Sequence, residues 1–354
     1  VNAYLSSIED EKITDANVTL EGKTLGFGNS TRVIDDNAAT AKNQTFAKNG
    51  LTLTVNSDSD TGASRFRFSE NANITGTGKF STAGLIIDKN VNVNYNIISD
   101  KNTVIRKRGE GSLTLNGNSK NDVEVNIGEG SLILDNSNGY AASHIRVAQG
   151  AKVILNKDNQ LNDNKIYFGH RGGTLELKGQ NLEFNDIYHL DKDAIIANKE
   201  STTKSKFTFT QGKDRVFLGK FSGNMDVEYN PNETKDNAKW NLRGDTDITG
   251  DLNVKKGIVS ISGDVITSGY ENNVLENQFE KTTFKAGNIN VDNDSTLQLD
   301  RATKVDSNIN VSGKLNLNAT GEVLTKLDKT KPYKDYEDQS EVNKVNVNGN
   351  ITFK

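Results

Sequence analysis

The stretch Glu110-Gly111-Ser112-Leu113-Thr114-Leu115 decides the fold, because it returns along the chain. Its copies are Glu129-Gly130-Ser131-Leu132-Ile133-Leu134, Gln149-Gly150-Ala151-Lys152-Val153-Ile154-Leu155 and Gly172-Gly173-Thr174-Leu175-Glu176-Leu177. From Gly111 to Gly130, Gly150 and Gly173 the spacings are 19, 20 and 23 residues, and segments 256–261 and 312–317 continue the motif. A repeat of about 20 residues built on a short strand indicates a solenoid, in which strands of successive coils pair into parallel sheets.

Alternation of apolar and polar residues extends this pattern. Leu51–Val55, Val91–Tyr95 and Val123–Ile127 place an apolar side chain at every second position. Such a period is typical of half-buried strands, and Gly, Asn and Asp separate the runs. The most helix-like segment, 271–280, is interpreted as part of a loop. The sequence therefore predicts an all-β fold, a right-handed parallel β-helix (a three-sided β-solenoid) with loop excursions.

Composition favours the same architecture. Of 354 residues only 33% are hydrophobic, well below the ~45–50% usual for globular chains, so a thick core cannot be filled. A solenoid needs only a thin core that grows with length. The chain has no Cys, which excludes disulfides and Cys-based metal sites. Its 43 basic and 47 acidic residues are interspersed, so we expect no basic face for nucleic acid and no polybasic membrane patch.

Glycine and asparagine have expected places in the coils. Glycine precedes each repeated strand, where the chain turns a corner and positive φ is often needed. Asparagine tolerates the same turns and bonds locally to the backbone. Stacked at one place in successive coils, it is also expected to form a ladder of side-chain amides.

We expect one domain, a β-helical stalk over residues 1–354. The ranges 29–49, 230–237, 267–281 and 327–343 are polar or poorly patterned and are predicted to be loop excursions. No apolar run is long enough for a membrane-spanning helix. Val1–Asp10 lacks the pattern of a signal peptide, so we expect a processed or excised piece of a longer chain.

Several segments resemble a known family. They are Lys165–Phe184, Phe217–Val227, Trp240–Val254 with its Gly250-Asp251-Leu252-Asn253-Val254 strand, and Phe284–Leu297. In this order they resemble the passenger β-helix of immunoglobulin-A-protease-like autotransporters, over roughly residues 50–320. The resemblance implies a parent with an N-terminal chymotrypsin-like protease, a long right-handed β-helix, an autochaperone segment and an outer-membrane barrel.

This chain departs from that layout at both ends. The Gly-Asp-Ser-Gly nucleophile motif is missing, and the nearest string, Ser262-Gly263-Asp264-Val265, lacks the serine. Long aromatic-flanked strands of the membrane type are also missing. We therefore expect a stalk that is not an enzyme itself and that needs no cofactor and no metal.

The candidate catalytic and metal-binding residues have simpler structural interpretations. His144, His170 and His189 lack the context of a Ser–His–Asp triad, so no catalytic role is expected. The pairs Asp245/Asp247 and Asp292/Asp294 are interpreted as acidic edges, and Asp58-Ser59-Asp60 is too little for a calcium loop. One adhesion tripeptide of the integrin-binding type, Arg243-Gly244-Asp245, is expected at a coil corner.

The predicted function is adhesion. Flat solenoid faces with repeated Asn, Asp, Thr and Lys can align and add many weak hydrogen bonds. The resemblance to adhesive passengers implies homotypic binding to the same protein on neighbouring cells, and binding to host extracellular-matrix proteins or the epithelial surface. We expect a location at the bacterial cell surface, no binding to nucleic acid and no membrane insertion. The alternatives are a passive spacer that displays a protease, and a carbohydrate-binding or carbohydrate-processing β-helix.

Overall fold

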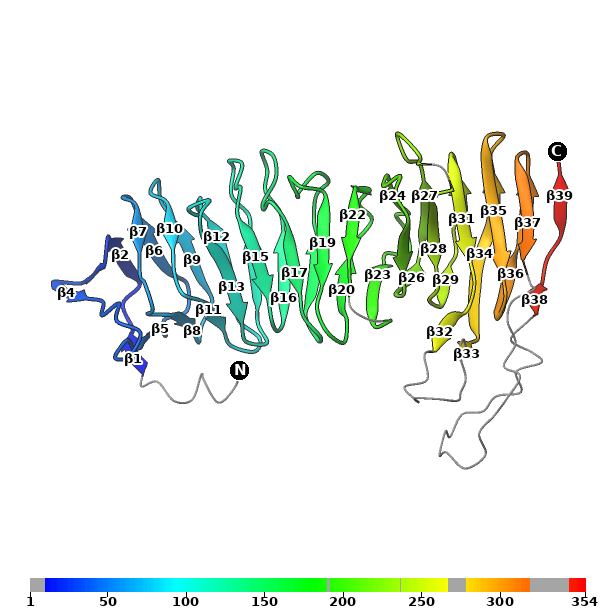
Figure 1. The fold of residues 1–354 in the computed structure, drawn as a ribbon. Helices are drawn as coiled ribbons and strands as arrows, with labels where there is room; N and C mark the ends of the chain where they lie inside the picture. The colour runs from blue at the N-terminus through cyan, green and yellow to red at the C-terminus, as the bar shows by residue number, and fades with distance from the viewer. Residues whose placement is uncertain (1–9, 190–191, 236, 267–277, 319–343) are drawn as a thin grey trace, which may run out of the picture. The chain divides into compact units, whose positions relative to one another are not determined.

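The computed structural model describes residues 10–189, 192–235, 237–266, 278–318 and 344–354. Every regular element in these ranges is a β-strand (Figure 1). The described part of the chain thus offers no helix that could cross a membrane. The chain divides into two compact units, Val1–Gln180 and Asn181–Lys354. Each unit is built of stacked coils with parallel strand pairing, which confirms the predicted all-β solenoid.

The first unit has two long parallel sheets. One contains β1 (Asp10–Ile13), β5 (Asn43–Phe46), β8 (Phe66–Phe68), β11 (Leu85–Ile87), β13 (Val104–Arg108), β15 (Glu124–Ile127), β17 (Ile145–Val147) and β19 (Lys165–Phe168). The other contains β2 (Asn17–Glu21), β6 (Leu51–Val55), β9 (Ala72–Thr75), β12 (Asn92–Asn96), β14 (Ser112–Leu115), β16 (Ser131–Leu134), β18 (Lys152–Leu155) and β20 (Gly173–Glu176). The third side is short, with β7 (Ser59–Asp60), β10 (Phe80–Ser81) and isolated bridges such as Ala142↔Leu161.

The second unit has three parallel sides. The first contains β23 (Ala194–Asn198), β26 (Lys220–Gly223), β29 (Thr246–Ile248) and β38 (Val345–Val347). The second contains β21 (Leu182–Phe184), β24 (Ser205–Phe209), β27 (Met225–Tyr229), β30 (Leu252–Val254) and β39 (Ile351–Phe353). The long strands β34 (Thr282–Val291) and β36 (Thr303–Val311) serve both sides. The third side contains β25 (Arg215–Phe217), β28 (Lys239–Leu242), β31 (Gly257–Ile261), β35 (Ser295–Asp300) and β37 (Lys314–Asn318). The strand β22 (Asp186–Tyr188) does not belong to this side and precedes β23 in the chain.

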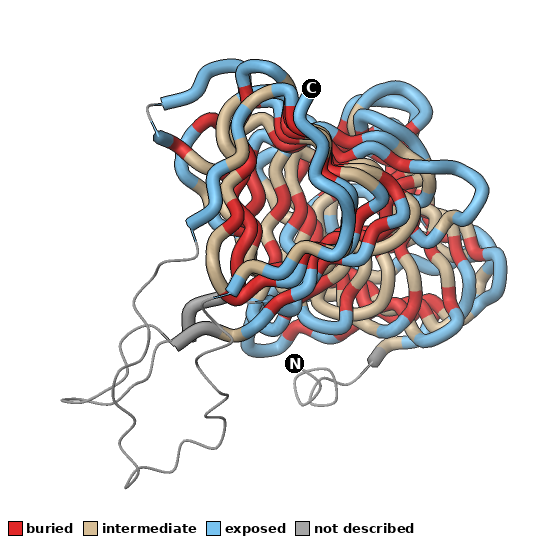
Figure 2. Tube along the Cα trace, turned by 90° about the vertical axis from the view of Figure 1, so that its right-hand side faces the viewer, coloured by how far each residue is buried: buried red, intermediate tan, exposed pale blue. Residues whose placement is uncertain are grey.

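The strand register keeps equivalent positions of the repeat in columns. Leu113 pairs with Leu132, Leu132 with Val153, and Val153 with Leu175, as the repeated motif predicts. Buried positions alternate with more exposed ones along the coils (Figure 2). Because only every second side chain points inward, a chain with few apolar residues fills this core.

Aromatic residues pack against one another in the core of each unit. In the first unit Phe46 stacks on Phe68, with ring centroids 5.0 Å apart. In the second unit the indole of Trp240 lies 4.7 Å from Phe209 and 5.5 Å from Tyr229. Such ring contacts add to the stabilisation from burial, since offset and edge-on pairs are favourable.

Two corner glycines show different reasons for that residue. Gly130 has φ of 68°, the left-handed conformation that the sequence predicted before a strand. Gly111 does not have positive φ, but a Cβ there would lie 2.2 Å from the carbonyl oxygen of Asp88 in the preceding coil. Close stacking of coils therefore requires glycine at position 111.

The loop predictions need correction. The range 29–49 is not one loop, because it contains β4 (Ser30–Val33), the antiparallel partner of β3 (Thr24–Phe27), and the buried coil strand β5. Hydrophobic alternation misses β5 because its buried side chains are mainly polar, and Gln44 accepts a hydrogen bond from Arg32 and donates one to Glu11. In the range 267–281, residues 278–280 form β33 (Gln278–Glu280), which pairs antiparallel with β32 (Asp264–Ile266). The remaining residues 267–277, and the whole range 327–343, lie outside the described residues.

Candidate adhesion surface

Polar side chains on the outer face of β9, β12 and β14 form a hydrogen-bonded ladder. Asn94 Nδ2 donates to Asn73 Oδ1 at 2.9 Å, and Asn92 Nδ2 donates to Asn94 Oδ1 at 3.0 Å. Ser112 and Thr114 donate their hydroxyls to Asn92 Oδ1 at 2.8 and 2.9 Å. The ladder thus links three successive coils, and the predicted stacking of asparagine amides is confirmed.

A second ladder lies on β30, β34 and β36 of the other unit. Asn290 Nδ2 donates to Asn253 Oδ1 at 2.9 Å, and Asn310 Nδ2 donates to Asn290 Oδ1 at 3.0 Å. Asp251 accepts the backbone N–H of Asn288 at 2.8 Å. We call these two sets, Asn73/Asn92/Asn94 and Asn253/Asn290/Asn310, the asparagine ladders.

The ladder amides keep unused hydrogen-bonding capacity. A side-chain amide has two N–H donors and two acceptor lone pairs. The ladder bonds of Asn94 use one donor and one lone pair, and its side chain is half-buried at the surface. Asn94 can therefore both donate to and accept from a partner in front of the sheet without breaking the ladder. Asn92 keeps only a donor, because its Oδ1 accepts two bonds, and Asn290 keeps only an acceptor, because its Nδ2 also donates to Asp251 at 3.4 Å.

The tripeptide Arg243-Gly244-Asp245 lies at the expected corner, between β28 and β29. The Arg243 guanidinium turns back onto the sheet, where it donates to Asn241 Oδ1 at 2.9 Å and to Ser260 Oγ at 3.0 Å. Only 17% of the Arg243 side chain is exposed. Asp245 is exposed, but it accepts the backbone N–H of Thr283 at 2.8 Å. A receptor would have to break these bonds to engage both charges.

A pocket of about 270 Å³ adjoins this corner. Lys192, Lys220 and Lys281 line it together with the tripeptide, and so does Glu280. Lys192 and Glu280 form an ion pair at 3.3 Å across it. Charges of both signs compensate each other there, so the pocket has no strong preference for one sign of ligand.

The three histidines lie in different coils. His144 Nε2 contacts Glu124 at 2.6 Å, so a carboxylate occupies the nitrogen that a nucleophilic serine would use. Its Nδ1 contacts Asp163 at 3.2 Å. His189 Nε2 accepts the backbone N–H of Leu218, and His170 lies in the turn between Gly169 and Gly172.

The candidate carboxylates have structural partners. Asp58 and Asp60 accept the backbone N–H groups of Lys79 and Gly62, which ties turns together. Asp292 pairs with Lys255 at 3.7 Å. Within the described ranges, no group of three or more His, Asp or Glu side chains could hold a metal ion.

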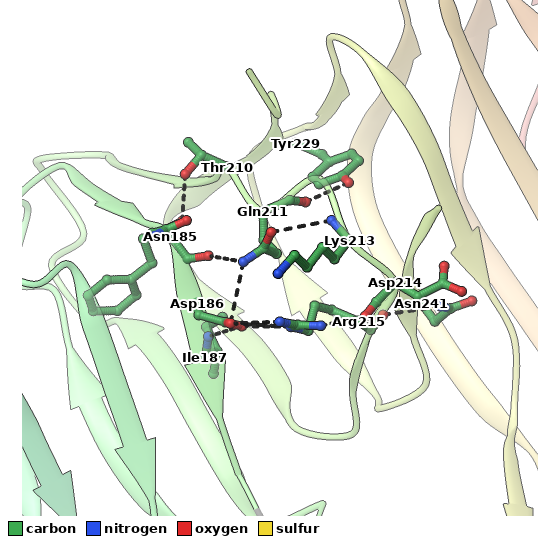
Figure 3. A network of polar contacts seen from close by, with 11 residues as sticks. Asn185, Asp186, Ile187, Thr210, Gln211, Lys213, Asp214, Arg215, Tyr229 and Asn241 are labelled. Atoms are coloured by element: carbon green, nitrogen blue, oxygen red, sulfur yellow. Dashed lines mark hydrogen bonds and ion pairs between the residues drawn. The ribbon is translucent and has the colours of Figure 1, made fainter. Parts of the chain in front are cut away.

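A buried polar network lies between turns of the second unit (Figure 3). The Asp186 carboxylate, 4% exposed, accepts from Arg215 Nε at 3.1 Å, and this bond raises the pKa of Arg215. Gln211 also donates to Asp186, at 3.4 Å. Burial raises the pKa of Tyr229 to about 12, so its hydroxyl stays protonated and donates to the Gln211 carbonyl at 2.8 Å. Asn241 donates to the Arg215 carbonyl and extends the network to β28.

A parallel β-solenoid with stacked amide ladders on its outer faces is the class of protein that the fold and the surface define. Comparison with known proteins gives the family. Residues 223–354 match the model of the PIC/HAP1/IgA0 second beta-solenoid repeat region. The resemblance to passenger β-helices of immunoglobulin-A-protease-like autotransporters is thereby confirmed.

Relatives of known sequence are autotransporters. The chain is 30% identical over 262 residues to serine protease EspC of Escherichia coli. This alignment covers 71% of the chain and 20% of EspC. It is 27% identical over 319 residues to the adhesion and penetration protein autotransporter of Haemophilus influenzae, covering 76% of the chain and 22% of that protein. The chain thus spans about a fifth of the length of these relatives.

Solved structures share the fold. The crystal structure of the Haemophilus influenzae Hap adhesin matches 96% of the chain and 47% of its own, with a TM-score of 0.78 and 19% sequence identity. The passenger domain of the plasmid encoded toxin of Escherichia coli matches 90% of the chain and 38% of its own, with a TM-score of 0.72 and 22% identity. At this identity the likeness concerns the fold alone.

Proposed function

We propose that this chain is a non-catalytic adhesive segment of a secreted autotransporter passenger. At the bacterial cell surface it binds copies of itself on neighbouring cells and so promotes aggregation and biofilm formation. Attachment to host cells or extracellular matrix is the second part of the proposal. It draws support from the relative named as an adhesion and penetration protein.

The asparagine ladders are the observation that carries the proposal. The ladder amides retain hydrogen-bonding capacity, and the bond between stacked amides repeats over three coils at Asn253, Asn290 and Asn310. Two such faces offer each other many similar donors and acceptors. Individually weak bonds add when they are formed together on one rigid surface. Self-association of this kind needs no pocket and no cofactor.

Lysine substitutions test this surface. Asn94→Lys with Asn290→Lys adds one charge to each ladder, so that two apposed faces repel. We expect self-association to weaken at least about tenfold, equivalent to ~1.4 kcal/mol. The measurements are sedimentation velocity of the purified chain over a range of concentration, and settling of bacteria that display the whole passenger.

The matched control is Asn118→Lys with Asn293→Lys, which adds the same charge at exposed turn positions outside the ladders. This control should associate like the unmodified chain. If the ladder variant also settles like the unmodified chain, the solenoid is a passive spacer and the proposed function is wrong.

A further inference from the structure

Half of the chain's ten arginines lie on one outer face of the first unit. They are carried by or adjoin strands β8, β13 and β17 of a single sheet. We call this set the arginine face, and its members are Arg65, Arg67, Arg106, Arg108 and Arg146.

Strand register sets these arginines in two rows that run across the strands. Phe66, Leu85 and Lys107 are register partners, so the residues just before them, Arg65, Gly84 and Arg106, lie side by side. In the next row Ile86 lies between Arg67 and Arg108. Neighbouring strands are about 4.8 Å apart, so the arginines of a row are separated by roughly 10 Å.

The first row continues into later coils. Arg106 pairs with Asn126, Asn126 with Arg146, and Arg146 with Tyr167. In this row Gly84 lies between Arg65 and Arg106, and Asn126 lies between Arg106 and Arg146. The Arg146 guanidinium carbon lies 4.3 Å from the centroid of the Tyr167 ring, a cation–π contact between neighbouring strands.

Positive charge exceeds negative charge on this face. Asp88 binds Arg67 at 3.1 Å, and Glu124 is shared between Arg146 and His144. The side chain of Arg106 is exposed and makes no hydrogen bond or ion pair to any described residue.

Arg108 repels both Arg65 and Arg106. Burial and the neighbouring guanidinium of Arg108 lower the pKa of Arg65, and burial and Arg106 lower that of Arg108. Glu129 is the carboxylate that opposes this effect on Arg108. An external anion would relieve the repulsion.

We propose that the arginine face binds a linear anionic polysaccharide, whose sulfate or carboxylate groups lie over the two rows. A guanidinium offers paired N–H donors that match the oxygens of either group. A polymer with regularly repeated charges can contact several arginines at once, and these contacts add. The site lies on a different sheet from the asparagine ladder of this unit, so it does not depend on self-association.

The chemistry of the face favours a saccharide over a nucleic acid. Single strands bind proteins largely by stacking bases on exposed aromatic rings. In the rows described, the outward residues between the arginines are Gly84, Ile86 and Asn126, and Tyr167 already stacks on Arg146. Hydroxyl-rich sugar rings need no such platform.

Heparin, a sulfated and carboxylated glycan, is the probe for a test by surface plasmon resonance with the full chain. The variant Arg65→Gln, Arg106→Gln, Arg108→Gln should bind heparin at least about tenfold more weakly. Arg106→Gln alone should weaken binding about threefold and leaves the fold unaffected, because the Arg106 side chain bonds to no described residue. Desulfated heparin should bind less tightly than heparin.

The control variant also loses three positive charges, but from exposed lysines in turns. Its substitutions are Lys48→Gln, Lys89→Gln and Lys101→Gln. It should bind heparin within about threefold of the unmodified chain. Equal losses in the control and the arginine variant would overturn the proposal. So would binding of single-stranded DNA as tightly as heparin. Self-association of the arginine variant should be unchanged, which separates this test from that of the asparagine ladders.

Discussion

Lys107 is buried, although lysine side chains are usually exposed to solvent. Its side chain is fully buried, and its ammonium donates to the carbonyl oxygens of Gly109, Gly111 and Glu129 at the corner between two coils. The sequence alone does not predict this burial, because Lys107 lies between two arginines in a basic run of the kind that is usually exposed to solvent. Strict alternation along β13 turns it inward and its neighbours outward.

The pH dependence of stability should report on this lysine. Burial lowers the pKa of Lys107 to about 7, with Arg108 adding to the effect and Glu129 opposing it. The unfolded chain keeps the ordinary value of 10.5 and so binds more protons between pH 7 and 10.5. The free energy of unfolding should therefore rise with pH in this window, by at most about 1.4 kcal/mol per pH unit from this group.

Lys107→Met removes the titrating group, so this contribution should vanish. Chemical denaturation of both proteins at pH 7.0 and 9.5 gives the comparison. The unmodified chain should gain more stability between the two pH values than the variant does. Parallel changes in the two proteins would show that Lys107 does not titrate in this range.

At the scale of the element, strand pairing could be predicted from the sequence more reliably than polar contacts could. The repeated motif at Gly111, Gly130, Gly150 and Gly173 places β14, β16, β18 and β20 in register. The ladder at Asn94 follows from the same logic, because a period of two and a fixed coil length put equivalent residues on top of each other. The buried polar strand β5 could not be predicted in this way. Its Gln44 side chain bonds to Glu11 and Arg32, which belong to other strands.

The Asp186–Arg215 pair is the clearest polar contact between elements, joining β22 to β25. The Asp186 carboxylate is 4% exposed and the Arg215 side chain 35% exposed, so removing Asp186 leaves a guanidinium that is only partly solvated. Asp186→Ala should lower the free energy of unfolding by about 2 kcal/mol, less than for a fully buried pair. Fluorescence of Trp240, the only tryptophan in the chain and buried in the same unit, follows the transition.

Lys204→Met is the control for that substitution, because the Lys204–Asp226 pair lies at the surface with the lysine side chain 51% exposed. Its loss should cost less than about 1 kcal/mol. Equal effects of the two substitutions would show that the Asp186 network contributes little to stability.

At the scale of the whole molecule, interspersed charge along the chain does not mean interspersed charge in space. Arg65, Arg106 and Arg146 are about 40 residues apart in sequence, two coils each time, and the solenoid sets them in one row. The expectation of no basic face rested on the linear order of charges. Register partners between β8 and β19 of this sheet are 19 to 22 residues apart in sequence, as from Phe66 to Leu85 and from Leu85 to Lys107, and this coil length decides which charges meet. A change of one residue in a coil would turn a strand's side chains to the other face.

Salt should therefore separate the two proposed binding activities of the molecule. Self-association through the asparagine ladders depends on neutral amides, whereas polysaccharide binding depends on arginine charges that dissolved ions screen. Raising NaCl from 0.1 M to 0.5 M should weaken heparin binding at least about tenfold, as for other polyanions bound by several cationic side chains. Sedimentation should show self-association changed by less than about threefold over the same range. If salt dissolved the self-associated form as readily as the heparin complex, charged residues rather than the ladders would hold the copies together.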